Sequence, residues 1–332
     1  MIMSRTPFRI SFFGGGTDYP GWYRENGGAI LGTTIDKYCY VMLRYLPPFF
    51  DHKYRIRYSL REETQTIDEI KHPSVRECLR FMNPERGVEV QHNSDLPARS
   101  GIGSSSAFTV GLLNALYALK GKMVTKRQLT MDAIRIEQEQ IQENVGSQDQ
   151  TLAAFGGFAK ITFGGAQEVT VQPMIVDADR LRRLEEHFML FFTGFSRNAS
   201  DIAGEQIRTL RNKTKELKMM AQLTEEAVDI LSSNSSSFER FGELLDENWK
   251  IKRSLTTKIT TPFVDELYET ARRCGATGGK LLGAGGGGFI LFFVKPELQP
   301  KLKETLKNLI LVPFSFENLG SQIIYYKPDN NY

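Results

Sequence analysis

The chain is poor in cysteine and histidine. Its 332 residues include three cysteines, Cys39, Cys78 and Cys274, which lie far apart and form no C-x-x-C pair. This spacing excludes a disulfide framework and a structural zinc site, and it is typical of a reducing compartment. The four histidines are scattered without the spacing of metal ligands, and no Ser-His-Asp pattern emerges from the spacing.

Long apolar runs and a strong excess of one charge are also missing. The longest apolar run, Phe289 to Val294, is far shorter than the roughly 20 residues that a membrane helix needs. Arg5 and Arg9 interrupt the start of the chain, so no signal peptide is expected. The net charge is only +3, which argues against a nucleic-acid partner. We therefore expect a cytoplasmic protein without membrane or nucleic-acid partners, either a monomer or a homodimer.

Glycine, by contrast, is concentrated in three loops, at residues 14–16, 101–103 and 283–288. The last loop satisfies G-x-G-x-x-G, but a strand-like run follows it where a dinucleotide-binding motif needs a helix. No G-x-x-x-x-G-K-[ST] segment occurs, which excludes a P-loop. A nucleotide and a second small substrate that meet between two domains would explain all three loops.

The segment from Leu96 to Lys120 has the pattern of a loop that enters a helix. Gly101 and Gly103 let the backbone turn and approach a ligand, and Ser104 begins a run of serines that favours a helix start. Such a helix start can bind a phosphate, because its N–H groups are unpaired. The pattern alone also fits a serine-rich loop that caps a core helix.

Strands and helices alternate along the chain, which predicts an α+β fold. We place the domain boundary near residue 182, giving domains of residues 1–182 and 183–332. The predicted strands are 5–13, 29–35, 38–46, 54–59, 88–93, 158–163, 168–173, 188–193 and 289–294, with two more at the end of the chain. The predicted helices are 73–81, 104–119, 125–143, 199–232, 238–255, 262–274 and 296–309.

Three carboxylates lie next to the glycine loops in sequence or on the helices that follow. They are Asp18, Glu137 and Asp149. Their local sequence is equally typical of turn residues or of a solvated helix face. The residues alone therefore leave their role open.

Three segments together resemble the ordered motifs of the GHMP kinase superfamily, which includes galactokinase, homoserine kinase and mevalonate kinase. They are RTPFRISFFGGGTDYP, PARSGIGSSSAF and LLGAGGGGF. The resemblance spans essentially the whole chain. It implies a ribosomal-protein-S5-like amino-terminal domain, a ferredoxin-like carboxy-terminal domain and an active site between them.

The resemblance also implies a role for each matching residue. Asp149 would be the general base, Arg9 would lie beside the transferred phosphoryl group and keep Asp149 ionised, and Mg²⁺ would be held by Ser105 and Glu137. The ATP phosphates would bind to the loop formed by Pro97, Ser100, Gly101, Ile102, Gly103, Ser104, Ser105 and Ser106.

The acceptor is indicated by the first motif. Galactokinases have GEHTDYN where this chain has GGGTDYP, so Gly15 and Gly16 replace a glutamate and a histidine. This change makes room and removes a negative charge, which suits a larger or anionic sugar. Asp18 is retained and is expected to accept hydrogen bonds from sugar hydroxyls. The predicted acceptor-binding residues are Gly15, Gly16, Thr17, Asp18, Arg197, Lys280, Gly285 and Gly286.

Further segments, among them TGFSRNAS, resemble the heptose-phosphate kinase branch of the family. That branch implies phosphorylation of the anomeric hydroxyl of a heptose 7-phosphate. Arg197 and Lys280 would then clamp the acceptor phosphate, although ordinary surface cations are an equal alternative. A neutral sugar such as L-fucose or galactose is the second choice of acceptor. A non-catalytic sensor of ATP and sugar is the alternative from another functional class.

Overall fold

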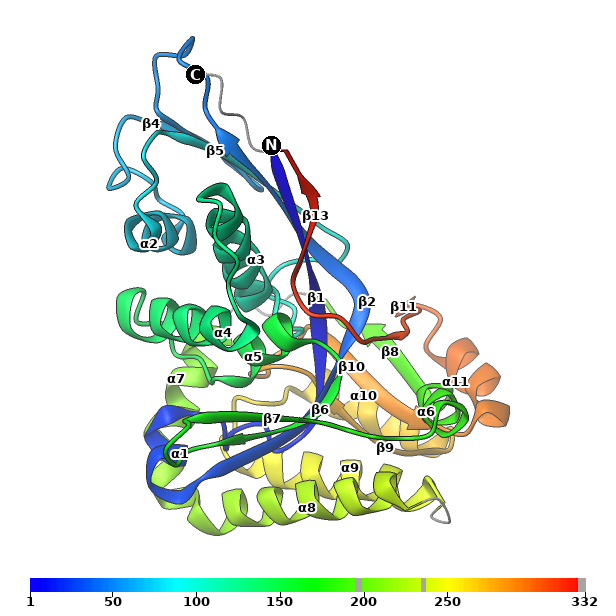
Figure 1. Ribbon diagram of the computed structural model, residues 1–332. Coiled ribbons are helices and arrows are strands. Elements are labelled where there is room, and N and C mark those ends of the chain that lie inside the picture. The colour runs from blue at the N-terminus through cyan, green and yellow to red at the C-terminus, as the bar shows by residue number, and fades with distance from the viewer. Residues whose placement is uncertain (195–198, 234–236, 328–332) are drawn as a thin grey trace.

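Two long antiparallel strands form the spine of the molecule (Figure 1). In the computed structural model, which describes residues 1–194, 199–233 and 237–327, these are β1 (Ile2–Phe13) and β2 (Gly28–Tyr45). Their pairing runs from Ile2 opposite Leu43 to Phe13 opposite Leu31. The buried residues of β1 are almost continuous towards its end, as expected for a strand covered on both faces.

Within the described residues, the first sheet has nine strands and is built outward from this pair. Its main order is β13-β1-β2-β5-β3-β4, while β6 and β12 also pair with β2, and β7 pairs with β6. The remaining strands of this sheet are β3 (Tyr54–Arg57), β4 (Arg61–Thr64), β5 (Val88–Ser94), β6 (Phe158–Phe163), β7 (Val169–Pro173), β12 (Phe316–Glu317) and β13 (Gln322–Tyr326).

Helices of the amino-terminal half cover one side of the spine (Figure 1). They are α2 (Pro73–Met82), α3 (Ser104–Leu119), α4 (Lys126–Arg135) and α5 (Gln148–Phe155). The α3 helix packs on both β1 and β2 and is buried on nearly all sides, because its sequence is apolar around most of its circumference. A π-helical segment, Ile136–Gln140, continues α4.

The second sheet is four-stranded and antiparallel, in the order β11-β8-β10-β9. Its strands are β8 (Phe188–Phe192), β9 (Ala276–Leu281), β10 (Phe289–Val294) and β11 (Ile310–Val312). The helices of this half are α6 (Ala178–Glu185), α7 (Ala199–Thr209), α8 (Thr214–Ser232), α9 (Glu239–Ser254), α10 (Pro262–Arg273) and α11 (Gln299–Thr305), of which α9 and α10 pack on β9.

The predicted α+β class is confirmed by these two sheets and their helices. The last two strands return to the first sheet, where β13 pairs with β1 and β12 pairs with β2. The division of the chain at residue 182 stays a prediction. Within the described residues, no helix is both long enough and apolar enough to cross a membrane.

Several elements differ from the sequence prediction. The predicted strands 29–35 and 38–46 are one strand, β2, because both halves pair with β1 across a bulge. The helix predicted at 199–232 is divided into α7, a 3-10 turn (Leu210–Lys213) and α8. The prediction missed the helices α1 (Pro20–Asn26), α5 and α6 and the strands β4 and β9. The sequence ATGGKL of β9 has little strand character.

An aromatic cluster joins the two sheets. The ring of Phe12, on β1, stacks on Phe188 of β8 at a centroid distance of 5.0 Å. It also meets the edges of Phe158 on β6 and Phe241 on α9, at 5.6 and 6.1 Å. Because Phe12 is fully buried and touches both halves of the chain, it couples their packing.

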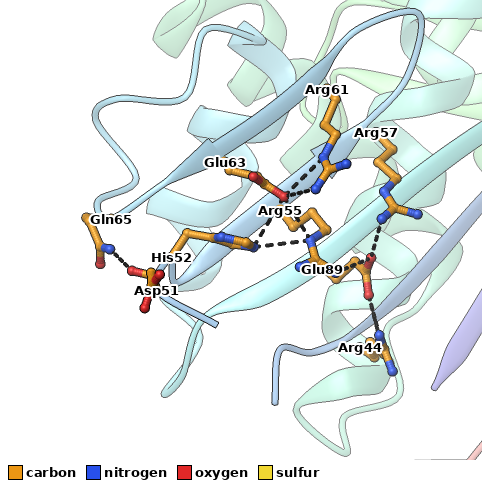
Figure 2. A network of polar contacts seen from close by, with 9 residues as sticks. All are labelled: Arg44, Asp51, His52, Arg55, Arg57, Arg61, Glu63, Gln65 and Glu89. Atoms are coloured by element: carbon orange, nitrogen blue, oxygen red, sulfur yellow. Dashed lines mark hydrogen bonds and ion pairs between the residues drawn. The ribbon is translucent and has the colours of Figure 1, made fainter. Parts of the chain in front are cut away.

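A network of charged side chains stabilises the far end of the first sheet (Figure 2). Glu89 on β5 accepts from Arg44 on β2 at 2.7 Å and forms a longer ion pair with Arg55 on β3. Glu63 on β4 pairs with Arg55 and Arg61. Each carboxylate is shared between neighbouring strands, so the network holds β3 and the edge strand β4 against β5 and β2.

We expect Phe12→Ala to lower the free energy of unfolding by about 3–5 kcal/mol, because it opens a cavity where the two sheets meet. Urea unfolding of the purified protein measures this change. Phe49→Ala, at a phenylalanine that is 75% exposed, is the control and should cost far less. Equal losses in the two variants would contradict the coupling role of Phe12.

Candidate active site

The second and third glycine loops contact each other through their backbones. A Cβ atom at Gly101 would lie 2.4 Å from the carbonyl oxygen of Leu282, and one at Gly283 would lie 2.5 Å from the Cα of Gly101. The N–H of Phe289 also donates to Ser100 O at 3.1 Å. The third loop therefore packs directly on the loop that precedes α3, and this approach requires glycine on both sides.

Arg9 connects three parts of the chain at this point. Its Nε and Nη2 donate to the two carboxylate oxygens of Asp149, each at 2.7 Å, and its Nη1 donates to Gly101 O at 2.7 Å. The Arg9 side chain is 5% exposed and that of Asp149 is 24% exposed. Such a bidentate, charge-assisted pair fixes the orientation of both groups. It leaves the carboxylate partly open to a ligand.

Two helices begin beside this pair. Gly103, in the left-handed conformation, is the N-cap of α3, and Asp149 lies in the first turn of α5. A Cβ atom at Gly103 would lie 3.1 Å from the Cγ of Arg9 and 3.4 Å from Asp149 Oδ2. The unpaired N–H groups and partial positive charge of the two helix starts favour an anion here.

Glu137 is buried beside the start of α3. Its Oε2 accepts from Ser106 Oγ at 2.8 Å and from the amide of Gln150, while its Oε1 is buried and has no hydrogen-bond partner among the described residues. Burial raises the pKa of Glu137 to about 7, although the hydrogen bonds from Ser106 and Gln150 oppose this shift. A buried carboxylate with an unpartnered oxygen is a candidate ligand for a cation.

The first glycine turn lies at the end of β1. The Thr17 hydroxyl lies 2.8 Å from Gly14 O and 2.9 Å from Ala29 O, so it holds the turn itself. Asp18 is buried and accepts from the N–H of Gly16 at 2.9 Å. Burial raises the pKa of Asp18, and the charge of Asp149 adds to this increase.

Comparison with known proteins decides the family. The GHMP kinases N terminal domain matches residues 72–157, and the GHMP kinases C terminal domain matches residues 220–309. The chain belongs to the GHMP kinases. It is therefore a phosphotransferase, and kinases of this family use ATP as the co-substrate.

Individual relatives resemble the chain over nearly its whole length. D-glycero-alpha-D-manno-heptose 7-phosphate kinase of Campylobacter jejuni is 28% identical over 317 residues, which is 92% of this chain and 93% of that protein. L-fucokinase/L-fucose-1-P guanylyltransferase of Bacteroides fragilis is 23% identical over 92% of this chain but only 36% of its own length. The solved structure of a D-glycero-D-manno-heptose 1-phosphate kinase from Bacteroides thetaiotaomicron has the same fold, with a TM-score of 0.79, 23% identity and coverage of 98% and 99% of the two chains.

The serine beside the buried carboxylate of this GHMP kinase differs from the predicted one. Within the described residues, the hydroxyl bonded to Glu137 is that of Ser106, whereas Ser105 is exposed in the first turn of α3. No group of three or more histidine, cysteine, aspartate or glutamate side chains in this described part could hold a metal. A carboxylate and serine hydroxyls are nevertheless hard oxygen donors, so the residues fit Mg²⁺ bound jointly with phosphate oxygens.

Three other residues that were predicted to bind the acceptor contact the backbone of neighbouring segments. Lys280, on β9, is buried and donates to Phe12 O at 3.1 Å. Gly285 and Gly286 pack against the backbone of Ile259. Arg197 lies outside the described residues. The roles assigned to these residues from the sequence stay predictions.

Sequence reasoning missed one charged residue of the site, Lys252 on α9. Its Nζ donates to Gly15 O and to Gln206 Oε1, each at 3.2 Å. The signal that could have found it is helical spacing. Lys252 follows the buried residues Leu245 and Trp249 at intervals of four and three, and so lies on the buried face of the helix.

We expect Gly283→Ala to destabilise the protein and to raise the KM for ATP, because the new Cβ would displace the loop before α3. The matched control is Gly165→Ala. Gly165 has nearly the same φ, +74° against +77° at Gly283, but a Cβ there would meet nothing within 4 Å. Both variants include the cost of about 1–2 kcal/mol for a left-handed residue, and only Gly283→Ala adds the clash.

Thermal unfolding and ATP-dependent kinetics of the two variants separate these contributions. Equal effects of Gly283→Ala and Gly165→Ala on both readouts would contradict the loop contact.

Proposed function

We propose that this GHMP kinase is a sugar 1-kinase. It transfers the γ-phosphoryl group of ATP to the anomeric hydroxyl of D-glycero-D-manno-heptose 7-phosphate. The product, heptose 1,7-bisphosphate, leads to GDP-heptose and surface glycans. The reaction takes place in the cytoplasm, in keeping with three free, buried cysteines.

The observation that carries this proposal is the Arg9–Asp149 pair beside the first glycine turn. Both carboxylate oxygens of Asp149 are oriented by Arg9, and the turn at Gly15 and Gly16 has no side chains to fill an acceptor site. The Campylobacter jejuni relative, named for heptose 7-phosphate, supports the choice of acceptor because it matches over 92% of this chain.

In the proposed reaction, Asp149 accepts the proton of the anomeric hydroxyl. The hydroxyl oxygen forms a bond to the γ-phosphorus as the bond from that phosphorus to the β–γ bridging oxygen breaks, and ADP leaves. Arg9 holds the carboxylate in place and lies where its guanidinium can stabilise negative charge on the transferred group. The N–H groups at the start of α3 hold the phosphates of ATP.

We propose that Glu137 and a serine hydroxyl of the first turn of α3 hold Mg²⁺. When bound, this ion neutralises charge on the β- and γ-phosphate oxygens. Glu137 supplies the buried, unpartnered Oε1. Ser105 remains the serine predicted from the sequence, and Ser106 is the one in contact with Glu137.

The test of the proposed function is ADP release with Mg-ATP and a panel of acceptors: D-glycero-D-manno-heptose 7-phosphate, mannose, L-fucose, galactose and mevalonate. We expect strong preference for the heptose phosphate. Turnover confined to L-fucose or galactose would keep the kinase but replace the acceptor. Tight binding of ATP and sugar without turnover would instead indicate a sensor.

We expect Asp149→Asn to lower kcat by about 10²–10⁴-fold, because the amide cannot take up the hydroxyl proton. ATP affinity should change little. The control is Asp179→Asn, at an exposed aspartate in the first turn of α6. Near-normal turnover by Asp149→Asn would remove Asp149 from the role of base.

A further inference from the structure

The backbone requires glycine at position 14 but not at position 15. Gly14 has a φ of +79°, and a Cβ there would lie 1.9 Å from Ala29 O, so the backbone itself requires glycine. At Gly15 the φ lies outside the left-handed region, and the nearest atoms to a Cβ would be Gln148 Nε2 and Ser11 Oγ, both at 3.8 Å. A Cβ at position 15 would make only ordinary van der Waals contacts, so the backbone does not require glycine there.

The two side chains nearest to position 15, those of Ser11 and Gln148, have unused hydrogen-bonding capacity. Ser11 Oγ and Gln148 Oε1 are both buried and have no hydrogen-bond partner among the described residues. They come from β1 and from the first residue of α5. Unpartnered buried polar atoms are rare in folded proteins and are costly unless a ligand or water satisfies them. Their position next to Gly15 indicates a polar ligand.

Lys252 brings a positive charge to the same turn. It is 6% exposed, its Nζ donates to Gly15 O and Gln206 Oε1, and a Cβ at Gly16 would lie 4.0 Å from this Nζ. Both acceptors are neutral oxygens, and they use two of the three N–H bonds. In the described part of the chain, Lys252 has no carboxylate within ion-pair distance. Burial lowers the pKa of Lys252 to about 8, because the charged ammonium is less stable away from water when no carboxylate pairs with it.

The surrounding charges add up to a cationic site. Lys280 is also buried, and burial, Lys252 and Arg9 all lower its pKa. In the part of the chain that the structure describes, the carboxylates near Lys252, Lys280 and Arg9 are those of Asp18 and Asp149, and Asp149 is already paired with Arg9. A bound anion would supply the missing negative charge, whereas a neutral sugar would not.

We propose that Lys252 binds the anionic group of a phosphorylated acceptor beside Gly15 and Gly16, and thereby selects sugar phosphates over neutral sugars. This inference rests on the proposed function, since it assigns a residue to the acceptor phosphate of that reaction. It makes Lys252 a specificity-determining residue that lies outside the three family motifs.

The test compares Lys252→Met with Lys250→Met. Lys250 lies on the same helix but is 61% exposed and pairs with Asp246, so its variant controls for the loss of a lysine from α9. We expect Lys252→Met to raise the KM for the heptose phosphate by about 10- to 150-fold. The KM for ATP should change by less than about twofold, and Lys250→Met should leave both constants unchanged.

Stability and binding give independent readouts. Removing a buried charge without a carboxylate partner should leave the thermal midpoint of Lys252→Met equal to or above that of the wild type. Calorimetric titration with the sugar phosphate should show the same loss of affinity without turnover. Lys252→Arg keeps the charge and should recover part of the affinity, which a purely structural role would not predict.

The outcomes separate this inference from the proposed function. If the wild type prefers the heptose phosphate and Lys252→Met leaves its KM unchanged, the inference is overturned and the function stands. A loss of ATP affinity alone would likewise overturn it, by assigning Lys252 to the nucleotide. If the wild type turns over neutral sugars only, the proposed acceptor fails, and the inference fails with it.

Discussion

The site depends on one guanidinium. Arg9 binds Asp149 through two charge-assisted hydrogen bonds and binds the loop before α3 through Gly101 O. These groups belong to β1, to α5 and to a loop between them, and 140 residues separate the arginine from the aspartate. Lysine could not replace this geometry, because a single ammonium cannot pair with both carboxylate oxygens in parallel and also reach the carbonyl.

The arrangement of Arg9 in turn depends on close backbone packing. The third glycine loop lies on the second at distances that exclude a Cβ on either side, so the carboxy-terminal half of the chain supports the loop before α3 through backbone contacts. Aromatic packing around Phe12, three residues after Arg9 on β1, joins the same two halves of the chain. Loop geometry and core packing are therefore linked through a single strand.

Burial shifts the pKa values of two charged groups of the site, Glu137 and Lys252. Glu137 is uncharged more readily than an exposed glutamate because burial raises its pKa to about 7, so a cation at its free oxygen would stabilise the charged form. Lys252 shows the opposite shift, to about 8, and an anion would stabilise its charge. Burial disfavours the charged form of both groups, so a bound ion of opposite charge would stabilise each of them. Without such an ion, their burial lowers the stability of the protein.

The sequence by itself determined the α+β class, because glycine spacing, helix starts and alternating apolar residues are local signals. The family, and with it the Arg9 and Asp149 candidates, came from the resemblance of three segments to the GHMP kinase motifs. Thr125 and Thr261 are the N-caps of α4 and α10, and each side chain accepts from the backbone N–H three residues later. Only the tertiary structure decided that Ser106 contacts Glu137 and that Lys252 reaches the glycine turn, 237 residues from Gly15. Such contacts depend on how helices pack across the two sheets, and packing is a long-range property that no single segment encodes.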